Sequence, residues 1–194
     1  MTLVLATFNH DKLKDLLSYL TSHFSTILPL SHWTQVDIEE TGQTFEENAL
    51  IKAQYSFDIT QHPSIADDSG FCMRSLDGLP GIYTGRFAKT PTGETNFKYA
   101  FEKLESALGE KDPITDFVCS LSYLDRDRTI VVRGVVEGFF DFSKKNNPGF
   151  GYTPIFVPLE NNPSQLSLSE MGDDVRRTYS ARKYAVNKLL SHFP

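Results

Sequence analysis

The spacing of apolar residues changes along the chain, and this change limits the folds that the chain can adopt. Residues 3–6 are a short apolar run, which is typical of a buried strand. Leucines then recur three and four positions apart through residues 13–20, which predicts an amphipathic helix. Residues 116–124 and 129–140 alternate instead, and the polar turn between them predicts an antiparallel hairpin. Strand-to-helix crossovers beside a hairpin indicate an α/β fold, with a long central mixed β-sheet flanked by helices.

Local start and stop signals place the remaining elements. Thr44 and Glu47 have the spacing of a capping box, so a helix is expected to begin there. Gly109 is a typical residue to end a helix that we expect to begin near Thr92. The other expected elements are a second strand within residues 25–38, a short strand at 64–66 that ends at the polar run 67–70, loops at 77–85 and 146–163, and a last helix from about residue 180.

Composition and charge exclude several classes of protein. A chain of 194 residues, 40% of them hydrophobic, fits one α/β domain or two tightly joined lobes. The net charge of −6 argues against broad binding to nucleic acid or to an anionic membrane. Cys72 and Cys119 form no CxxC pair, so neither a zinc site nor a disulfide framework is indicated. The apolar start lacks the basic region of a signal peptide, and no apolar run reaches membrane-spanning length, so the cytoplasm is the expected compartment.

Thr7, Asn9 and Lys12 lie where the first strand is expected to give way to a helix. The free N–H groups and the positive dipole at a helix start suit a phosphate group, and a lysine adds a point charge. The alternative is that Asn9 only caps the helix and that Lys12 is solvated. On this segment alone the alternative is favoured, because strand-to-helix junctions are common and the glycines of a phosphate-binding loop are absent.

Acidic residues are concentrated just before and inside the second expected helix. Their carboxylate oxygens are ligands that Mg²⁺ prefers. Glu46 and Glu47 are explained by the helix dipole, which favours acidic residues in a first turn. Glu39 and Glu40 precede the helix and are not explained in this way. Lys52 lies about two turns past the start of the helix and faces either a site or solvent.

The run Asp67-Asp68-Ser69-Gly70 follows an apolar strand and is the main candidate for a reacting centre. Two adjacent carboxylates are difficult to explain by packing. If the strand continues, successive side chains point to opposite faces, so that one carboxylate faces the site and the other is held by backbone donors or a lysine. The alternative is an ordinary turn, which Asp-Ser-Gly forms readily, and the run alone does not decide between the two.

Two later segments offer contacts to a base or a phosphate. The loop at 149–154 places Phe150 and Tyr152 between glycines, where their rings can stack against a base. A basic segment around the start of the last helix can supply further contacts, and consists of Arg176, Arg177, Ser180, Arg182 and Lys183. The alternatives are a loop anchored by its apolar residues and a solvated basic patch.

Taken in order, six segments resemble the inosine triphosphate pyrophosphatase family, also called the non-standard purine NTP pyrophosphatases. They are ATFNHDK at 6–12, ETGQTFEENALIKA at 40–53, IADDSGF at 65–71, LDGLPGIYTGRFA at 76–88, GFGYTPIF at 149–156 and SAR at 180–182. The segments run from near the start of the chain to the last helix, and chance does not explain a match of all six in order.

The resemblance implies both a fold and an activity. The implied fold is a single elongated ITPase-like domain over residues 1–194, in which two lobes enclose the active-site cleft, and the family is usually a homodimer. The implied activity is Mg²⁺-dependent hydrolysis of inosine, deoxyinosine and xanthosine triphosphates to the monophosphate and pyrophosphate, which keeps deaminated purines out of nucleic acid. Such phosphoryl transfer needs positioning and charge neutralisation more than covalent chemistry.

The resemblance also implies roles for individual residues. Asp68 matches the general base that activates water, and Glu40 and Asp68 match positions near Mg²⁺. Lys52 is expected to assist catalysis and to contact phosphate. The implied substrate contacts are Thr7, Asn9, Lys12 and Ser69 toward the phosphates, Phe150, Gly151 and Tyr152 as a wall against the base, and Thr153, Arg176 and Arg182 near the base or the adjoining phosphate.

Three departures from the family pattern concern the reading of the base. Thr153 stands where the family has aspartate, Ala181 stands where it has histidine, and Arg176 aligns with an expected lysine. Phe8, where a small residue is frequent, is a milder change. The loss of a hydrogen-bonding partner at a polar base edge can cost a large factor in discrimination. We therefore expect a base preference that is shifted or relaxed.

Three hypotheses about function follow from these observations. The first is a pyrophosphatase of this family, and the second is an enzyme on the same framework that acts on another modified or a pyrimidine nucleotide. The third is a non-catalytic protein that binds a nucleotide or a partner. The presence of Asp68, Glu40, Lys12 and Lys52 argues against the third hypothesis, because a decayed enzyme need not keep them.

Overall fold

The computed structural model describes residues 2–36 and 38–193, and the chain divides into two compact units. The first unit consists of Met1–Ser69, Cys119–Gly134 and Arg182–Pro194, and the second of Gly70–Val118 and Val135–Ala181. Three strands contribute residues to both units: β3 (Ser64–Met73), β4 (Ile114–Leu124) and β5 (Thr129–Phe140). Each unit is therefore assembled from segments that are far apart in the sequence.

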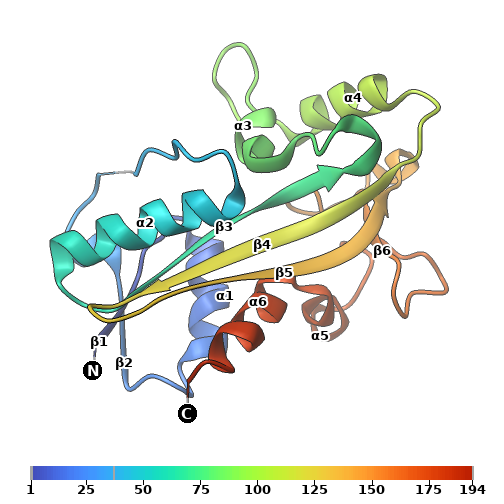
Figure 1. Cartoon of the computed structure of the whole chain (residues 1–194). Coiled ribbons are helices and arrows are strands. Elements are labelled where there is room, and N and C mark those ends of the chain that lie inside the picture. Colours follow the sequence, from blue (N-terminus) through green and yellow to red (C-terminus); the bar gives the residue numbers. More distant parts are fainter. Residues whose placement is uncertain (1, 37, 194) are drawn as a thin grey trace. The chain divides into compact units, whose positions relative to one another are not determined.

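The strands form one mixed sheet with the order β2-β1-β3-β4-β5-β6 (Figure 1). β1 (Thr2–Leu5) is parallel both to β2 (Thr26–Pro29) and to β3. β6 (Phe156–Pro158) is antiparallel to β5. Between β4 and β5, the N–H of Asp125 donates to the carbonyl of Arg128 and closes the turn. The predicted mixed sheet and the predicted hairpin are both confirmed.

In the first unit, α1 (His10–Leu20) and α6 (Ala181–Leu190) lie on one face of the strands, and α2 (Phe45–Thr60) lies on the other (Figure 1). α1 buries Leu16 and Leu20, and α2 buries a stripe of small and aromatic residues. Asn9 and Thr44 cap α1 and α2 by accepting hydrogen bonds from N–H groups of the first turn. Glu47 reaches back to the N–H of Gln43, so the predicted capping box is present with its second bond shifted by one residue.

The second unit contains α3 (Thr84–Phe87), α4 (Phe97–Leu108) and α5 (Asp173–Arg176). Its core is rich in aromatic rings, with Phe71 stacked on Phe117 at a centroid distance of 4.7 Å. Phe140, Tyr152 and Phe156 pack around Phe71. Short 3₁₀ turns at Leu30–His32, Arg74–Leu76, Gly81–Tyr83, Phe142–Lys144 and Arg177–Tyr179 complete the chain. Within the described residues, no helix is long and apolar enough to cross a membrane.

Several predicted boundaries are wrong. β3 does not end at residue 66 but continues through Asp67-Asp68-Ser69-Gly70 to Met73, so the turn alternative for this run is also wrong. The helix expected near Thr92 begins at Phe97, because Asn96 provides the cap and residues 90–94 form a turn. The expected loop at 77–85 contains a 3₁₀ turn and the start of α3. The expected loop at 146–163 contains the strand β6. The turn signal at 67–70 failed because long-range partners of β3 decide its backbone, whereas the later helix start follows from the local cap at Asn96.

Candidate active site

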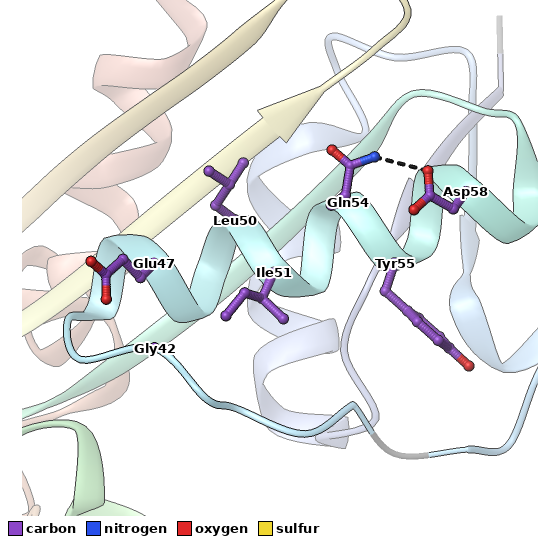
Figure 2. Close-up of a pocket in the computed structure, with 7 residues that line it drawn as sticks. All are labelled: Gly42, Glu47, Leu50, Ile51, Gln54, Tyr55 and Asp58. Atoms are coloured by element: carbon purple, nitrogen blue, oxygen red, sulfur yellow. Dashed lines mark hydrogen bonds between the residues drawn. The ribbon is translucent and has the colours of Figure 1, made fainter.

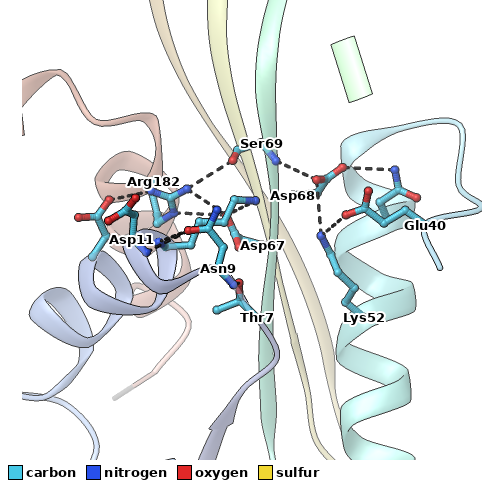
Figure 3. A network of polar contacts seen from close by, with 12 residues as sticks. Thr7, Asn9, Asp11, Glu40, Lys52, Asp67, Asp68, Ser69 and Arg182 are labelled. Atoms are coloured by element: carbon cyan, nitrogen blue, oxygen red, sulfur yellow. Dashed lines mark hydrogen bonds and ion pairs between the residues drawn. The ribbon is translucent and has the colours of Figure 1, made fainter. Parts of the chain in front are cut away.

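The candidate active site is built on β3, where three consecutive polar side chains alternate between the two faces of the strand (Figure 3). Asp67 and Ser69 point toward α1 and α6, where both contact Arg182. Asp68 points toward α2, where it contacts Asn48 and Lys52. The two carboxylates therefore lie on opposite faces, as the continuing strand requires, and Asp67 is held by a lysine as predicted.

Asp67 is a buried carboxylate that joins two helices of the first unit to β3. Its side chain is fully buried, and its Oδ2 accepts from Lys12 at 3.2 Å and from Arg182 at 3.1 Å. Burial alone would raise the pKa of Asp67, but the positive charges of Lys12, Arg182 and Lys52 hold it well below its usual range. Asp67 is consequently ionised in the folded protein at neutral pH, and it fixes two basic side chains that come from different helices.

Arg182 is buried and links α6 to α1 and β3. It donates to Asp15 at 2.8 Å and to Asp67, and its third contact is the hydroxyl oxygen of Ser69 at 3.3 Å. Burial alone would lower the pKa of Arg182, but the neighbouring carboxylates, Asp67 foremost, raise it. The solvated-patch alternative is thus wrong for Arg182. Because Ser69 accepts from an arginine, which has no acceptor, its own proton is available for another group.

The start of α1 is organised by Asn9, whose side-chain oxygen accepts from the N–H groups of Asp11 and Lys12 at 2.9 and 3.1 Å. The hydroxyl oxygen of Thr7 accepts from the N–H of Asn9 at 3.2 Å. Asn9 is therefore a helix cap, as the alternative held, but Lys12 is in an ion pair with Asp67 and not simply solvated. Contact of these three side chains with phosphate stays a prediction.

On the other face of β3, Lys52 stands between two carboxylates. Its ammonium lies 2.7 Å from Glu40 Oε1 and 3.5 Å from Asp68 Oδ1 (Figure 3). Burial alone would lower the pKa of Lys52, but Asp67, Asp68 and Glu40 together raise it. Lys52 therefore faces the site and not solvent, which decides the question that its sequence position left open.

Asp68 is buried but differs from Asp67 in its charge environment. Burial raises the pKa of Asp68 and the negative charge of Glu40 adds to this, while Lys52 and Lys12 oppose it without reversing it. The Lys52 ammonium, which Asp68 shares with Glu40, is not enough to lower the Asp68 pKa below its usual value. A carboxylate whose pKa lies above its usual value is a stronger proton acceptor, which suits a general base.

Glu40 and Asp68 both contact Lys52, so the two carboxylates share one ammonium group. The described residues contain no group of three or more His, Cys, Asp or Glu side chains that could hold a metal ion. Mg²⁺ commonly takes one or two protein carboxylates and completes its shell with water and substrate phosphates. This pair of carboxylates fits Mg²⁺ bound together with a nucleotide.

Two residues of the first unit make contacts that were not predicted. Asn48, fully buried on α2, donates to Asp68 Oδ2 at 3.2 Å, and its spacing of four residues from Lys52 was a signal that could have indicated this. Glu46, which we assigned only to the helix dipole, also accepts from Ser120 and Arg133 of the hairpin.

A separate pocket of about 560 Å³ lies along α2 (Figure 2). Its lining is mostly apolar and includes Leu50, Ile51 and Tyr55. It contains none of the predicted site residues. The pocket is therefore distinct from the polar network on β3.

The remaining predicted residues belong to the second unit. The ring of Phe150 is 69% exposed, whereas Tyr152 is buried and its hydroxyl donates to the Thr84 carbonyl at 3.0 Å. Thr153 donates its hydroxyl proton to the Phe150 carbonyl at 2.7 Å and accepts from the Phe150 N–H at 3.1 Å. Gly151 has a φ of 62°, which favours glycine at this turn. Arg176 is exposed and pairs with Asp173 of the same short helix.

Two relatives match over nearly the whole chain. A dITP/XTP pyrophosphatase from an Exiguobacterium species is 37% identical over 97% of this chain and 95% of its own length. A second, from Shewanella oneidensis, is 34% identical over 97% of this chain and 92% of its own length.

Solved structures match as well. The Ham1 protein of Staphylococcus aureus has a TM-score of 0.85 at 32% identity, and the match covers 99% of this chain and 97% of that one. The nucleoside-triphosphatase, or dITP/XTP pyrophosphatase, of Mycobacterium abscessus has a TM-score of 0.80 at 27% identity over the whole of both chains. The model of the Ham1 family matches residues 3–192, and the chain therefore belongs to the Ham1 family.

Proposed function

We propose that this protein is a hydrolase that cleaves non-standard purine nucleoside triphosphates, such as deoxyinosine and xanthosine triphosphates, to the monophosphate and pyrophosphate. The observation that carries the proposal is Asp68, a buried carboxylate with a raised pKa that is held between Asn48 and Lys52. The names of the relatives from Exiguobacterium and Shewanella support the substrate class.

In the proposed reaction, Asp68 accepts a proton from water as the water oxygen attacks the phosphorus atom. The bond between the α-phosphorus and its bridging oxygen breaks, and pyrophosphate leaves. Lys52 provides positive charge next to the base, and the hydroxyl of Ser69, oriented by Arg182, can donate to a phosphate oxygen. The exposed ring of Phe150 offers a stacking surface for a base.

The proposal includes Mg²⁺, which Glu40 would hold with Asp68 beside it. When bound, the ion would neutralise charge that develops on the phosphate oxygens. Lys52 keeps the two carboxylates side by side. Thr7, Asn9 and Lys12 are proposed phosphate contacts, since the N-terminal end of α1 and the ammonium of Lys12 both favour anions.

Release of pyrophosphate from a panel of nucleoside triphosphates, measured with Mg²⁺ and with EDTA, tests the proposal. We expect release that needs the metal and that falls by about 10²- to 10⁴-fold in Asp68→Asn, because the general base is lost. Binding of nucleotides without release from any of them would favour a non-catalytic role.

A second candidate function, hydrolysis with a shifted or relaxed base preference, is favoured by one observation. The hydroxyl of Thr153 donates its proton to the backbone of its own loop and also accepts from it, so that it offers a base N–H only one remaining lone pair in place of the carboxylate that the family has there. Exclusive hydrolysis of inosine and xanthosine triphosphates in the same panel would contradict this candidate.

We further propose that the protein is a homodimer, as the resemblance of the sequence implies, and that it acts in the cytoplasm, the compartment expected from the sequence. Multi-angle light scattering of the purified protein measures its mass in solution. A mass equal to that of one 21.9 kDa chain would contradict the dimer.

A further inference from the structure

We propose that Asn48 is a positioning residue that holds the Asp68 carboxylate in the orientation from which it accepts a proton from water. This inference rests on the proposed function. Asn48 is fully buried and lies one helical turn before Lys52 on the same side of α2. The two side chains bind different oxygens of Asp68: Asn48 Nδ2 lies 3.2 Å from Oδ2, and Lys52 Nζ lies 3.5 Å from Oδ1.

The orientation of the Asn48 amide is fixed by a second contact. Its Oδ1 accepts from the backbone N–H of Gly42 at 2.8 Å, which leaves the NH₂ group to face Asp68. An amide satisfies both neighbours, because Gly42 requires an acceptor and the carboxylate requires a donor.

The contacts also indicate which oxygen of Asp68 reacts. Oδ1 accepts from Lys52 and from the N–H of Ser69 at 3.1 Å. Among the described residues, Oδ2 accepts from Asn48 alone. Since a carboxylate oxygen has two acceptor positions, Oδ2 keeps one for a water proton, and the Asn48 amide sets its direction.

Asn48 also links Asp68 to the loop that carries Glu40. A Cβ atom on Gly42 would lie 2.7 Å from Asn48 Oδ1 and from the Cβ of Glu47, so the loop packs directly on the amide. Glu40, two residues earlier, binds Lys52. Asn48 and Lys52 thus join the same two elements at neighbouring points and hold Glu40 and Asp68 at a fixed separation.

Asn48→Asp tests this inference at a pH where the new carboxyl group is ionised, because it then keeps the shape and the acceptor for Gly42 but removes the donor to Asp68. We expect kcat for the preferred triphosphate to fall by about 10- to 100-fold, with KM near the wild-type value, as found when groups that orient a reacting ligand are changed. Ser56→Ala is the matched control. Ser56 is equally buried on α2 and also contacts β3, through Ser64 at 2.8 Å, but it is far along the helix from Asp68.

Melting temperatures separate positioning from stability. Loss of kcat in a folded Asn48→Asp variant, with kcat retained in Ser56→Ala at a comparable melting temperature, supports the inference. If Asn48→Asp does not fold, Gly42→Ala decides, because its added methyl displaces the Asn48 amide: lower kcat supports the inference and wild-type kcat overturns it. Wild-type kcat in folded Asn48→Asp overturns the inference alone, whereas a wild-type protein that releases no pyrophosphate overturns the proposed function and the inference together.

Discussion

Asp67 and Asp68 are adjacent in β3, yet their carboxylates have opposite pKa shifts. Asp67 is held between Lys12 and Arg182, and its pKa lies well below the usual range. Asp68 shares Lys52 with Glu40, and its pKa is raised. The alternation of a strand places the two residues on opposite faces, so one sequence run serves two purposes. Asp67 is held by two cations, and Asp68 keeps a raised pKa, as its proposed role as general base requires.

Asp68→Asn is expected to remove activity without loss of stability. Because the folded pKa of Asp68 is raised, its contribution to stability is complete below the unfolded pKa and is lost as the pH rises through the folded pKa. At neutral pH the ionised Asp68 side chain therefore lowers the stability of the folded wild type, and the neutral amide of the variant does not. Thermal unfolding at neutral pH checks this, and the expected melting temperature is equal to or above that of the wild type. A clear decrease would contradict the assignment of Asp68 as a strained, functional carboxylate.

Asp67→Asn is expected to have the reverse effect. The folded pKa of Asp67 is lowered, so its stabilisation is present above the unfolded pKa and is lost as the pH falls from about 4 through the folded pKa. The variant should be less stable than the wild type at pH 7, and the difference should shrink in acid. Urea unfolding of both proteins at several pH values measures this. A stability difference that is independent of pH would show that the charge of Asp67 is not its cause.

Arg182→Met is expected to destabilise the first unit strongly. Removing one partner of a buried ion pair typically costs about 3–5 kcal/mol, because it leaves the other charge buried and unpaired. Here Asp67 would lose one of its two direct cationic partners. The free energy of unfolding in urea is the measurement.

Arg176→Met serves as the control for this prediction, since Arg176 forms an exposed ion pair with Asp173 and such pairs contribute about 0–1 kcal/mol. If the two variants lose similar amounts of unfolding free energy, the burial of the Arg182 ion pair does not increase its contribution to stability.

The elements that the sequence predicted well carry their signals locally. α2 has its cap at Thr44, and the hairpin has its alternation and polar turn within one segment. The extent of β3 was not predictable, because Asp67 pairs both with Lys12 and with Arg182, which is 115 residues away in the sequence. No local sequence pattern predicts the ion pair with Arg182, and Asp-Ser-Gly on its own favours a turn.

In the candidate site, too, some features were predictable from the sequence and others were not. The resemblance selected Glu40, Lys52 and Asp68, and the structure brings them into contact. Asn48 was within reach of sequence reasoning through its helical spacing from Lys52, but its burial was not.

Thr153→Val is expected to weaken substrate binding without changing the choice of base. The hydroxyl of Thr153 makes both of its hydrogen bonds to the backbone of Phe150, which holds the loop in a turn that presents the exposed ring. Valine has the same shape but neither bond, and each such bond contributes about 0.5–1.5 kcal/mol. We therefore expect KM to rise by a similar factor for every triphosphate that the protein hydrolyses, while the ratios of kcat/KM between bases stay unchanged.

The matched variant is Thr153→Ser, which keeps the hydroxyl and should restore KM. Steady-state kinetics with at least three triphosphates that differ only in the base provide the measurement. A change in the ratios of kcat/KM for Thr153→Val would mean that the hydroxyl reads the base directly. Because the single hydroxyl proton is donated to the Phe150 carbonyl and one lone pair accepts from the Phe150 N–H, direct reading without a rearrangement of the loop would have to use the one remaining lone pair of the oxygen.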